Sequence, residues 1–203
     1  MMIVKYVIDT NVIRDLSARS NDVEAQKHQK QCQHFWKKIK EDSNAILMIP
    51  EEVKVELDVQ LLAEIPPKPN ERQRILDAVN DCQIVYEKST RKIENKLREL
   101  SAILKAKYGS RIHEECQLTP QHMQVSDARI LSAAYEQDAI LVTRNIKDFI
   151  LYLFLSEADE EVLYDTGRGE YLSVSTELHE AVLSDEEFSA RLEDFFEIWN
   201  QLD

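Results

Sequence analysis

Short apolar runs alternate with longer segments of helical periodicity over the first 150 residues. Three runs, at residues 3–8, 44–49 and 139–143, are rich in β-branched side chains and apolar at nearly every position. Buried parallel strands show this pattern because both faces of the sheet are covered. A fourth, shorter strand is predicted at residues 83–86. Helical spacing of apolar side chains predicts helices over five further segments: about 22–40, 50–63, 71–81, 90–108 and 120–137.

This order of elements predicts an α/β fold with a parallel sheet that helices cover on both faces. The proline-rich segment at residues 65–70 is the clearest interruption of the pattern. Residues 151–203 are expected to form an extension that packs on the same domain.

The C-terminal extension has its own pattern. Residues 162–165 and 171–175 flank a Gly167-Arg168-Gly169 segment, which predicts a hairpin. The last acidic helix repeats large apolar side chains at helical spacing: Phe188, Leu192, Phe195, Phe196, Trp199 and Leu202. We expect this face to pack on its own domain, and contact with a second copy or a partner protein is the alternative.

Composition and charge narrow the class of protein. The 203-residue chain is 43% hydrophobic and 31% charged, as in globular proteins. No apolar run approaches the roughly 20 residues that span a bilayer, no signal peptide is evident, and the three cysteines are widely separated. These features predict a cytoplasmic protein without a membrane partner.

The net charge of −13 argues against a broad basic surface for nucleic acid. Any such contact would need bound metal ions, a partner or a local basic patch. The richest basic stretch contains Arg91, Lys92, Lys96, Arg98, Lys105 and Lys107. The default interpretation of this stretch is an ordinary solvated helix, and a patch that contacts nucleic acid is the alternative.

Polar side chains follow two of the predicted strands. Asp9 comes directly after the first strand, and Thr143, Asn145 and Asp148 end the strand at 139–143 or follow it. In parallel sheets the functional crevice lies beyond the carboxyl ends of the strands. Helix capping and turn formation explain the same residue types equally well at this stage.

Two further carboxylates lie on predicted helices. Glu56 falls at the edge of the apolar stripe of its helix, whereas Asp58 points away from that stripe. Asp127 shares a face with Ile130 and Leu131, which is costly unless the carboxylate is paired, metal-bound or a helix cap. Carboxylates that share a crevice raise one another's pKa unless a cation lies between them. Ligands with oxygen donors alone point to Mg²⁺ or Mn²⁺, which suit phosphate chemistry.

Four short segments occur in the order typical of one family: 7–13 (VIDTNVI), 49–57 (IPEEVKVEL), 126–134 (SDARILSAA) and 141–149 (LVTRNIKDF). Over about residues 2–150 the chain resembles the PIN domain family of metal-dependent ribonucleases, which includes the VapC-type toxins of toxin–antitoxin pairs. The resemblance implies a Rossmann-like catalytic domain over residues 1–150, with a parallel sheet flanked by helices, extra helices inserted at about 66–120 and a C-terminal extension. It further implies one or two Mg²⁺ or Mn²⁺ ions and hydrolysis of RNA phosphodiester bonds by a metal-bound water. It also implies an RNA substrate, and an antitoxin and a second copy of the chain as candidate partners.

The resemblance assigns roles to particular residues. Asp9, Glu56 and Asp127 would be metal-binding, catalytic carboxylates, with Asn11, Thr143 and Asn145 as polar partners. The family often has an aspartate where this chain has Asn145, so Asp148 is the candidate for the missing fourth carboxylate.

Two other functions stay open. One is a catalytically weak or inactive binding module with the same fold, which the neutral Asn145 and the acidic net charge favour. The other is a phosphatase with Asp9 as nucleophile. Asn11 stands where such an enzyme would carry a second aspartate, and this weakens that interpretation.

Overall fold

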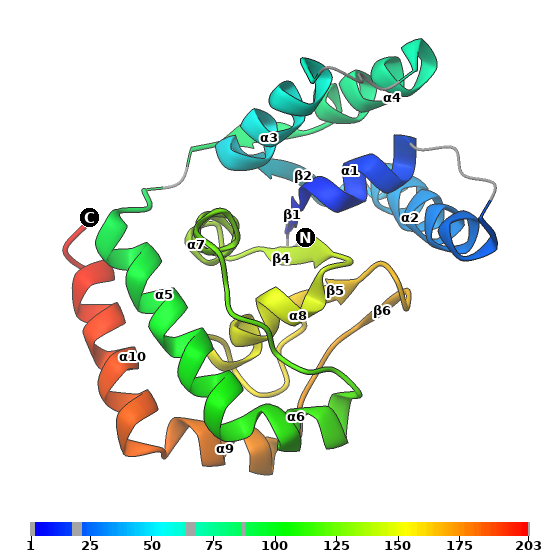
Figure 1. The fold of residues 1–203 in the computed structure, drawn as a ribbon. Helices are drawn as coiled ribbons and strands as arrows, with labels where there is room; N and C mark the ends of the chain where they lie inside the picture. The colour runs from blue at the N-terminus through cyan, green and yellow to red at the C-terminus, as the bar shows by residue number, and fades with distance from the viewer. Residues whose placement is uncertain (1–2, 18–21, 64–67, 87, 203) are drawn as a thin grey trace.

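A six-stranded sheet in the order β3-β2-β1-β4-β5-β6 forms the centre of the protein (Figure 1). The computed structural model describes residues 3–17, 22–63, 68–86 and 88–202. Five strands are mutually parallel and β6 alone is antiparallel to its neighbour. The strands are β1 (Val4–Ile8), β2 (Ala45–Pro50), β3 (Gln83–Val85), β4 (Ile140–Thr143), β5 (Leu163–Asp165) and β6 (Glu170–Tyr171). The predicted α/β fold with a parallel sheet is confirmed.

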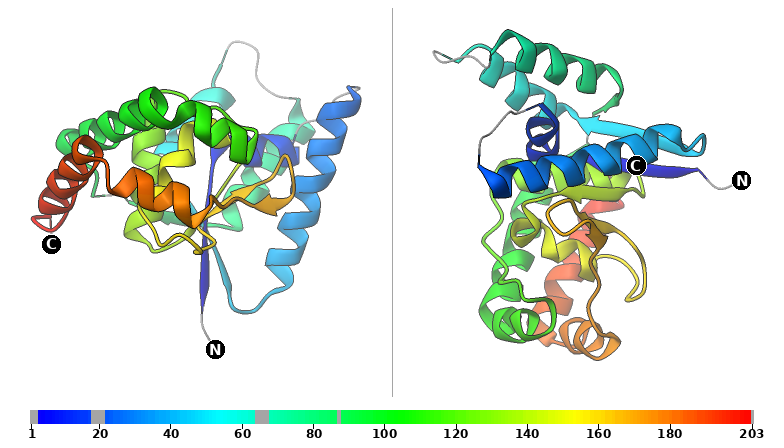
Figure 2. Two further views of the ribbon diagram at one scale, coloured as in Figure 1. Left: turned by 90° about the horizontal axis from the view of Figure 1, so that it is seen from below. Right: turned by 90° about the vertical axis from the view of Figure 1, so that its right-hand side faces the viewer.

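Helices cover both faces of this sheet. The helical elements are α1 (Thr10–Ser17), α2 (Val23–Glu41), α3 (Glu51–Leu61), α4 (Pro69–Asn80), α5 (Arg91–Ile103), the π-helical η1 (Leu104–Tyr108), α6 (Gly109–Cys116), α7 (Val125–Glu136), α8 (Ile146–Phe149), the 3₁₀-helical η2 (Ile150–Phe154), α9 (Thr176–Leu183) and α10 (Glu186–Trp199). Figure 1 shows α7 and α2 on opposite sides of β1, and Figure 2 shows the same arrangement from two other directions. Strands buried in this way need the continuous apolar runs that the sequence shows.

The chain reverses its direction across the sheet between β1 and β4. From β1 it moves outward through β2 to β3, and it then returns to the other side of β1 to form β4. In open α/β sheets such a switch point opens a crevice beyond the carboxyl ends of the two strands. Asp9 follows β1, and Thr143 ends β4, so the two residues flank this crevice. The Asp9 amide donates to the Val142 carbonyl at 3.1 Å.

Two helix boundaries differ from the predictions. The helix expected from about residue 120 begins only at Val125, because hydrogen bonds hold the preceding loop extended. Gln121 donates its amide to the Lys147 carbonyl at 2.9 Å, and its own carbonyl accepts from the Ser101 hydroxyl at 3.1 Å. The helix expected at 90–108 continues through η1 into α6, since Gly109 takes helical backbone angles instead of ending it.

The C-terminal residues contribute to both the sheet and the helical layer. β5 pairs with β4 in parallel, and β5 and β6 form the predicted hairpin. The turn includes Gly169 at a φ of +77°, a conformation that glycine adopts without steric cost. Helix α10 runs beside α5 (Figure 1) and buries Phe188 and Phe195 completely, while Trp199 packs edge-on against Tyr135 of α7. The apolar face of the last helix therefore packs largely on this chain.

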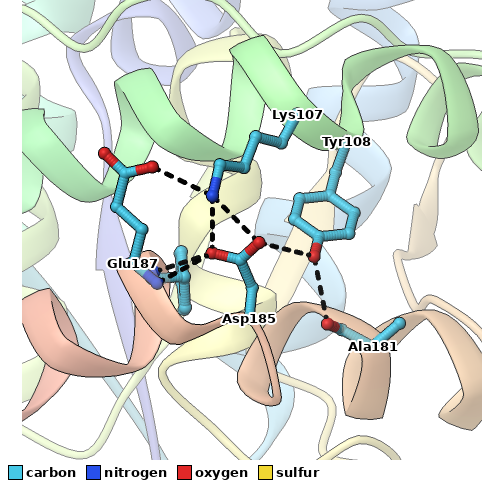
Figure 3. Close-up of polar contacts among 6 residues, drawn as sticks. Lys107, Tyr108, Ala181, Asp185 and Glu187 are labelled. Carbon is cyan, nitrogen blue, oxygen red and sulfur yellow. Dashed lines mark hydrogen bonds and ion pairs between the residues drawn. The ribbon is translucent and has the colours of Figure 1, made fainter.

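A polar contact ties η1 to the start of α10 (Figure 3). Lys107 pairs with Asp185 at 2.8 Å and with Glu187 at 2.9 Å, and the Tyr108 hydroxyl donates to the Ala181 carbonyl at 3.1 Å. Asp185 also caps α10 by accepting the amides of Glu187 and Phe188.

Within the described residues, no helix is long and apolar enough to cross a membrane.

Candidate active site

Asp9 is held at the carboxyl end of β1 by neighbours from two elements. Its side chain is 5% exposed, and its Oδ2 atom accepts hydrogen bonds from the Thr143 hydroxyl at 2.6 Å and from the Asn11 amide. Asn11 also donates to the Thr143 hydroxyl at 3.1 Å and accepts the backbone amide of Arg144 at 2.9 Å. This network fixes the position of the Asp9 carboxylate at the end of β1.

Glu56 reaches the same region from α3. Its Oε2 atom accepts a hydrogen bond from the hydroxyl of Thr10, which directly follows Asp9. The contact joins residues 46 positions apart and connects α3 to the start of α1. Asp58 instead pairs with Lys54 on the outer side of α3, as its place in the helical pattern predicts.

Asp127 lies in the first turn of α7. Its Oδ2 atom accepts the backbone amide of Gln124 at 3.0 Å, so this carboxylate is also a helix-capping group. Asp148 lies in α8, where its carboxylate accepts a hydrogen bond from the side-chain amide of Asn145.

One cavity of about 460 Å³ brings most of the predicted residues together. Its lining includes Asp9, Asn11, Glu56, Asp127 and Asn145 from the predicted set. Thr143 is fully buried behind Asp9, and Asp148 is not part of the lining. Thr10 and Arg14 also line the cavity, although the sequence patterns assigned no role to either. Arg14 lies one helical turn after Asn11, so this spacing could have placed the two side chains on the same face of a helix.

Crowding and burial shift the acidities of these carboxylates. Burial, with smaller contributions from the charges of Asp127 and Glu56, raises the pKa of Asp9 to about 6, although the Thr143 hydroxyl opposes the shift. Burial also raises the pKa of Asp127, and the charges of Asp148 and Glu56 add to this effect. The carboxylates therefore interact electrostatically, and a cation between them would relieve the repulsion.

The chemistry of the donors suits a divalent cation, but the side chains are not yet arranged around one. Asp9, Glu56 and Asp127 offer oxygen atoms alone, the ligands that Mg²⁺ and Mn²⁺ prefer. Across residues 3–17, 22–63, 68–86 and 88–202, however, no three His, Cys, Asp or Glu side chains are placed so that they could hold a metal ion. Glu56 instead accepts a hydrogen bond from the Thr10 hydroxyl.

Another strand-end carboxylate does not belong to the cavity. Asp165 lies opposite Thr143 in the sheet register and is 5% exposed. Its Oδ1 atom accepts the backbone amides of Gly167 at 2.7 Å and Arg168 at 3.2 Å. Asp165 is therefore a turn-forming residue of the β5–β6 hairpin.

Arg129 connects the helices that carry two of the site carboxylates. On α7, two residues after Asp127, it pairs with Glu52 of α3 at 2.9 Å and with Glu94 of α5 at 2.7 Å. Glu52 lies one helical turn before Glu56 on α3. The arginine thus holds α7 against α3 and sets the relative positions of Asp127 and Glu56.

The basic stretch of residues 91–107 makes mostly structural contacts. Lys96 pairs with Asp194 of α10 at 2.9 Å, and Lys107 forms the contact with Asp185 described above. Arg98 donates to the carbonyl of Met123 at 3.3 Å. Burial raises the pKa of Asp148, and the charge of Lys105 is among the contributions that oppose this shift.

Comparisons with known proteins find only limited similarity to this chain. No protein-family model matches the chain, and no curated protein sequence matches it. Solved structures that are similar to it include the following three. VapBC2 from Rickettsia felis, bound to a DNA fragment from its promoter, is 21% identical over 71% of this chain and 90% of that chain, with a TM-score of 0.46. FitAcB from Neisseria gonorrhoeae is 13% identical over 72% and 92% of the two chains, with a TM-score of 0.44. FitAB bound to an IR36 DNA fragment is 12% identical over 80% and 95%, with a TM-score of 0.46.

Proposed function

We propose that the protein is a Mg²⁺- or Mn²⁺-dependent endoribonuclease that hydrolyses phosphodiester bonds of RNA. One observation carries the proposal: three carboxylates from separate elements, Asp9, Glu56 and Asp127, line one cavity at the switch point of a parallel sheet. Asp9 is buried and Glu56 and Asp127 are half-buried, and their charges raise the pKa values of Asp9 and Asp127, an effect that a bound cation would relieve. The motif resemblance to PIN domain ribonucleases supports the same chemistry.

Each residue has a proposed part in this reaction. Asp9, Glu56 and Asp127 would hold the cation, and the bound cation would lower the pKa of a water and neutralise charge on the phosphate. Thr143 and Asn11 keep the Asp9 carboxylate oriented through their hydrogen bonds. Hydrolysis adds one water across a P–O ester bond, so one fragment ends in a phosphate and the other in a hydroxyl.

Two residues at the edge of the site extend this assignment. Arg14 lines the cavity and is exposed, so its guanidinium can contact a phosphate of the strand. Asp148 supplies a fourth carboxylate close enough to Asp127 to raise its pKa. In our proposal it takes the role of the acidic residue that Asn145 replaces.

The motif resemblance also supports a more specific role, the toxin of a toxin–antitoxin pair. An antitoxin protein would then be the physiological partner, and a homodimer the assembled form of the toxin. Induced expression in a bacterial host tests this role. We expect growth arrest with the native chain and none with the Asp127→Asn variant. Normal growth with active, soluble enzyme would contradict the toxin role and leave the nuclease proposal intact.

A cleavage assay with purified full-length protein tests the nuclease activity. After dialysis against EDTA, the protein should cut a single-stranded RNA oligomer only when Mn²⁺ or Mg²⁺ is added. Glu56→Gln should reduce the rate by more than the roughly 10–100-fold that loss of an outer-shell partner costs. Glu51→Gln, an exposed position on the same helix, is the matched control and should leave the rate unchanged.

The alternative function is a catalytically weak or inactive binding module with the same fold. The side chain of Asn145 favours it, since its amide brings no charge to the site and donates to Asp148. Calorimetry with Mn²⁺ separates the two functions. Mn²⁺ binding that Glu56→Gln abolishes, together with cleavage, supports the nuclease. RNA binding without Mn²⁺ binding or cleavage would replace the nuclease by the binding module.

A further inference from the structure

A second cavity lies between α2 and the β5–β6 hairpin, on elements that the acidic cavity does not use. Its volume is about 320 Å³, and we call it the tyrosine cavity. It is lined by Tyr6, His34, Phe35, Lys38, Ile39, Asp42, Tyr164, Gly169 and Tyr171. In Figure 1 the hairpin lies below α2, and the ring contact between Phe35 and Tyr164 joins these two elements. None of its lining residues is shared with the acidic cavity.

Aromatic rings form one side of this cavity. Phe35 and Tyr164 have ring centroids 4.6 Å apart, and Tyr164 meets Tyr171 edge-on at 5.1 Å. Tyr6 meets Phe35 edge-on at 5.8 Å from the opposite side. The mutual contacts hold the rings in fixed orientations. Tyr164 and Tyr171 remain partly exposed, so they offer ring surface to a planar ligand.

Basic side chains form the rim. His34 and Lys38 lie four residues apart on α2, so they project from the same face of the helix, and both are exposed. The neighbouring Lys37 and Lys40 pair with Glu41 and Asp81. Within the part of the chain that the structure describes, Lys38 has no ion-pair partner. Lys38 is therefore available to an anionic group of a ligand in the cavity.

We propose that the tyrosine cavity binds one nucleotide unit, with the base against the tyrosine rings and the phosphate at Lys38 and His34. Bases stack on aromatic side chains whatever their identity, and lysine contacts phosphate through its charge. The volume is at the small end of ligand cavities, about 300–1,000 Å³, which suits a single nucleotide. Asp42 also lines the cavity and would repel a phosphate, so the proposal assigns the phosphate to the side of the cavity formed by His34 and Lys38. The nucleotide is either a free ligand or one residue of a bound RNA strand.

Calorimetry in EDTA tests the proposal without any cleavage, so the result does not depend on the nuclease function. The probes are AMP, adenosine and inorganic phosphate, each titrated into the full-length protein. AMP should bind more tightly than either adenosine or phosphate. Lys38→Ala should weaken AMP binding about tenfold, the effect of losing one hydrogen bond to a charged group, and should leave adenosine unchanged. Lys37→Ala on the same helix is the matched control and should bind AMP as the native chain does.

A second variant examines the aromatic side of the cavity. Tyr171→Leu keeps an apolar side chain at the hairpin but removes the ring, so it should weaken both AMP and adenosine by about ten- to a hundredfold. Circular dichroism establishes that the variants are folded. No AMP binding at millimolar concentration, or binding that is the same in folded Lys38→Ala and Tyr171→Leu, would overturn the proposal.

The source of the nucleotide follows from one further titration in EDTA, with a single-stranded RNA oligomer. RNA that binds more tightly than AMP and depends on Lys38 identifies the cavity as a contact for the strand. AMP binding that the oligomer does not compete for identifies a free nucleotide as the ligand. Both outcomes support a nucleotide-binding cavity, and they separate its two uses.

Discussion

Replacing Asp9 by asparagine should stabilise the metal-free protein while it abolishes the proposed metal binding. In the fold, burial raises the pKa of Asp9 from 3.8 to about 6. Between about pH 4 and 6 the folded protein therefore holds the Asp9 proton more tightly than the unfolded chain does. The free energy of unfolding falls as the pH rises through this window, and the full loss is present above pH 6.

The size of this loss follows from the pKa shift. A shift of roughly two units corresponds to about 3 kcal/mol at about 1.4 kcal/mol per unit. An asparagine has nearly the same shape and no charge, so the variant avoids this cost. The substituted amide would still accept from Thr143, but the carboxylate's contact with the Thr10 backbone amide is weakened, so about 3 kcal/mol is an upper limit.

Urea unfolding in EDTA, followed by circular dichroism at several pH values, measures the effect. At pH 7.5 the Asp9→Asn variant should be more stable than the native chain by up to about 3 kcal/mol, and the difference should vanish near pH 4. Asp159→Asn, in an exposed loop, is the control and should show no such pH dependence. A variant that is less stable than the native chain at pH 7.5, or a difference independent of pH, would refute the reasoning.

Three further variants test other parts of the site and core. Arg129→Gln leaves Glu94 buried without its partner and should lower the free energy of unfolding by about 1–3 kcal/mol in urea titration. An unchanged unfolding midpoint would contradict the stabilising role of these ion pairs between the helices. Asp148→Asn removes a like charge and should lower the pKa of Asp127, as followed by carboxyl carbon NMR in EDTA, and an unshifted titration would show that the two side chains do not interact. Phe195→Ala should cost about 3–5 kcal/mol by the same urea titration, because the ring is completely buried; a loss below about 1 kcal/mol would mean that α10 packs only loosely.

The sequence was sufficient to predict the central strands of the fold. β1, β2 and β4 carry continuous apolar runs, which arise because both faces of a parallel sheet are covered. Helix α9 was missed: it is short, and its helical spacing was not distinguished from that of the final helix. The start of α7 was placed too early, because hydrogen bonds to Ser101 and Lys147 hold the preceding loop and no local pattern reports them.

The candidate site was predictable to the extent that its residues follow strands or interrupt apolar stripes. Asp9, Glu56 and Asp127 were identified in this way, and they line one cavity. Thr10 and Arg129 were not identified. The partner of Thr10 lies 46 residues away and the partners of Arg129 lie 35 residues away or more, and only the packing of the helices brings them together. Sequence patterns report the burial of a residue better than they report its partner.

The hydrogen bond between Thr143 and Asp9 joins residues 134 positions apart. A chain leaving the ribosome presents β1 before β4. A partly made chain that ends before β4 has Asp9 and Glu56 without Thr143, so the hydrogen bonds that orient Asp9 cannot all form. The acidic site is therefore completed only after β4 has been made. If the protein cuts RNA, it would stay inactive until that point in its own synthesis.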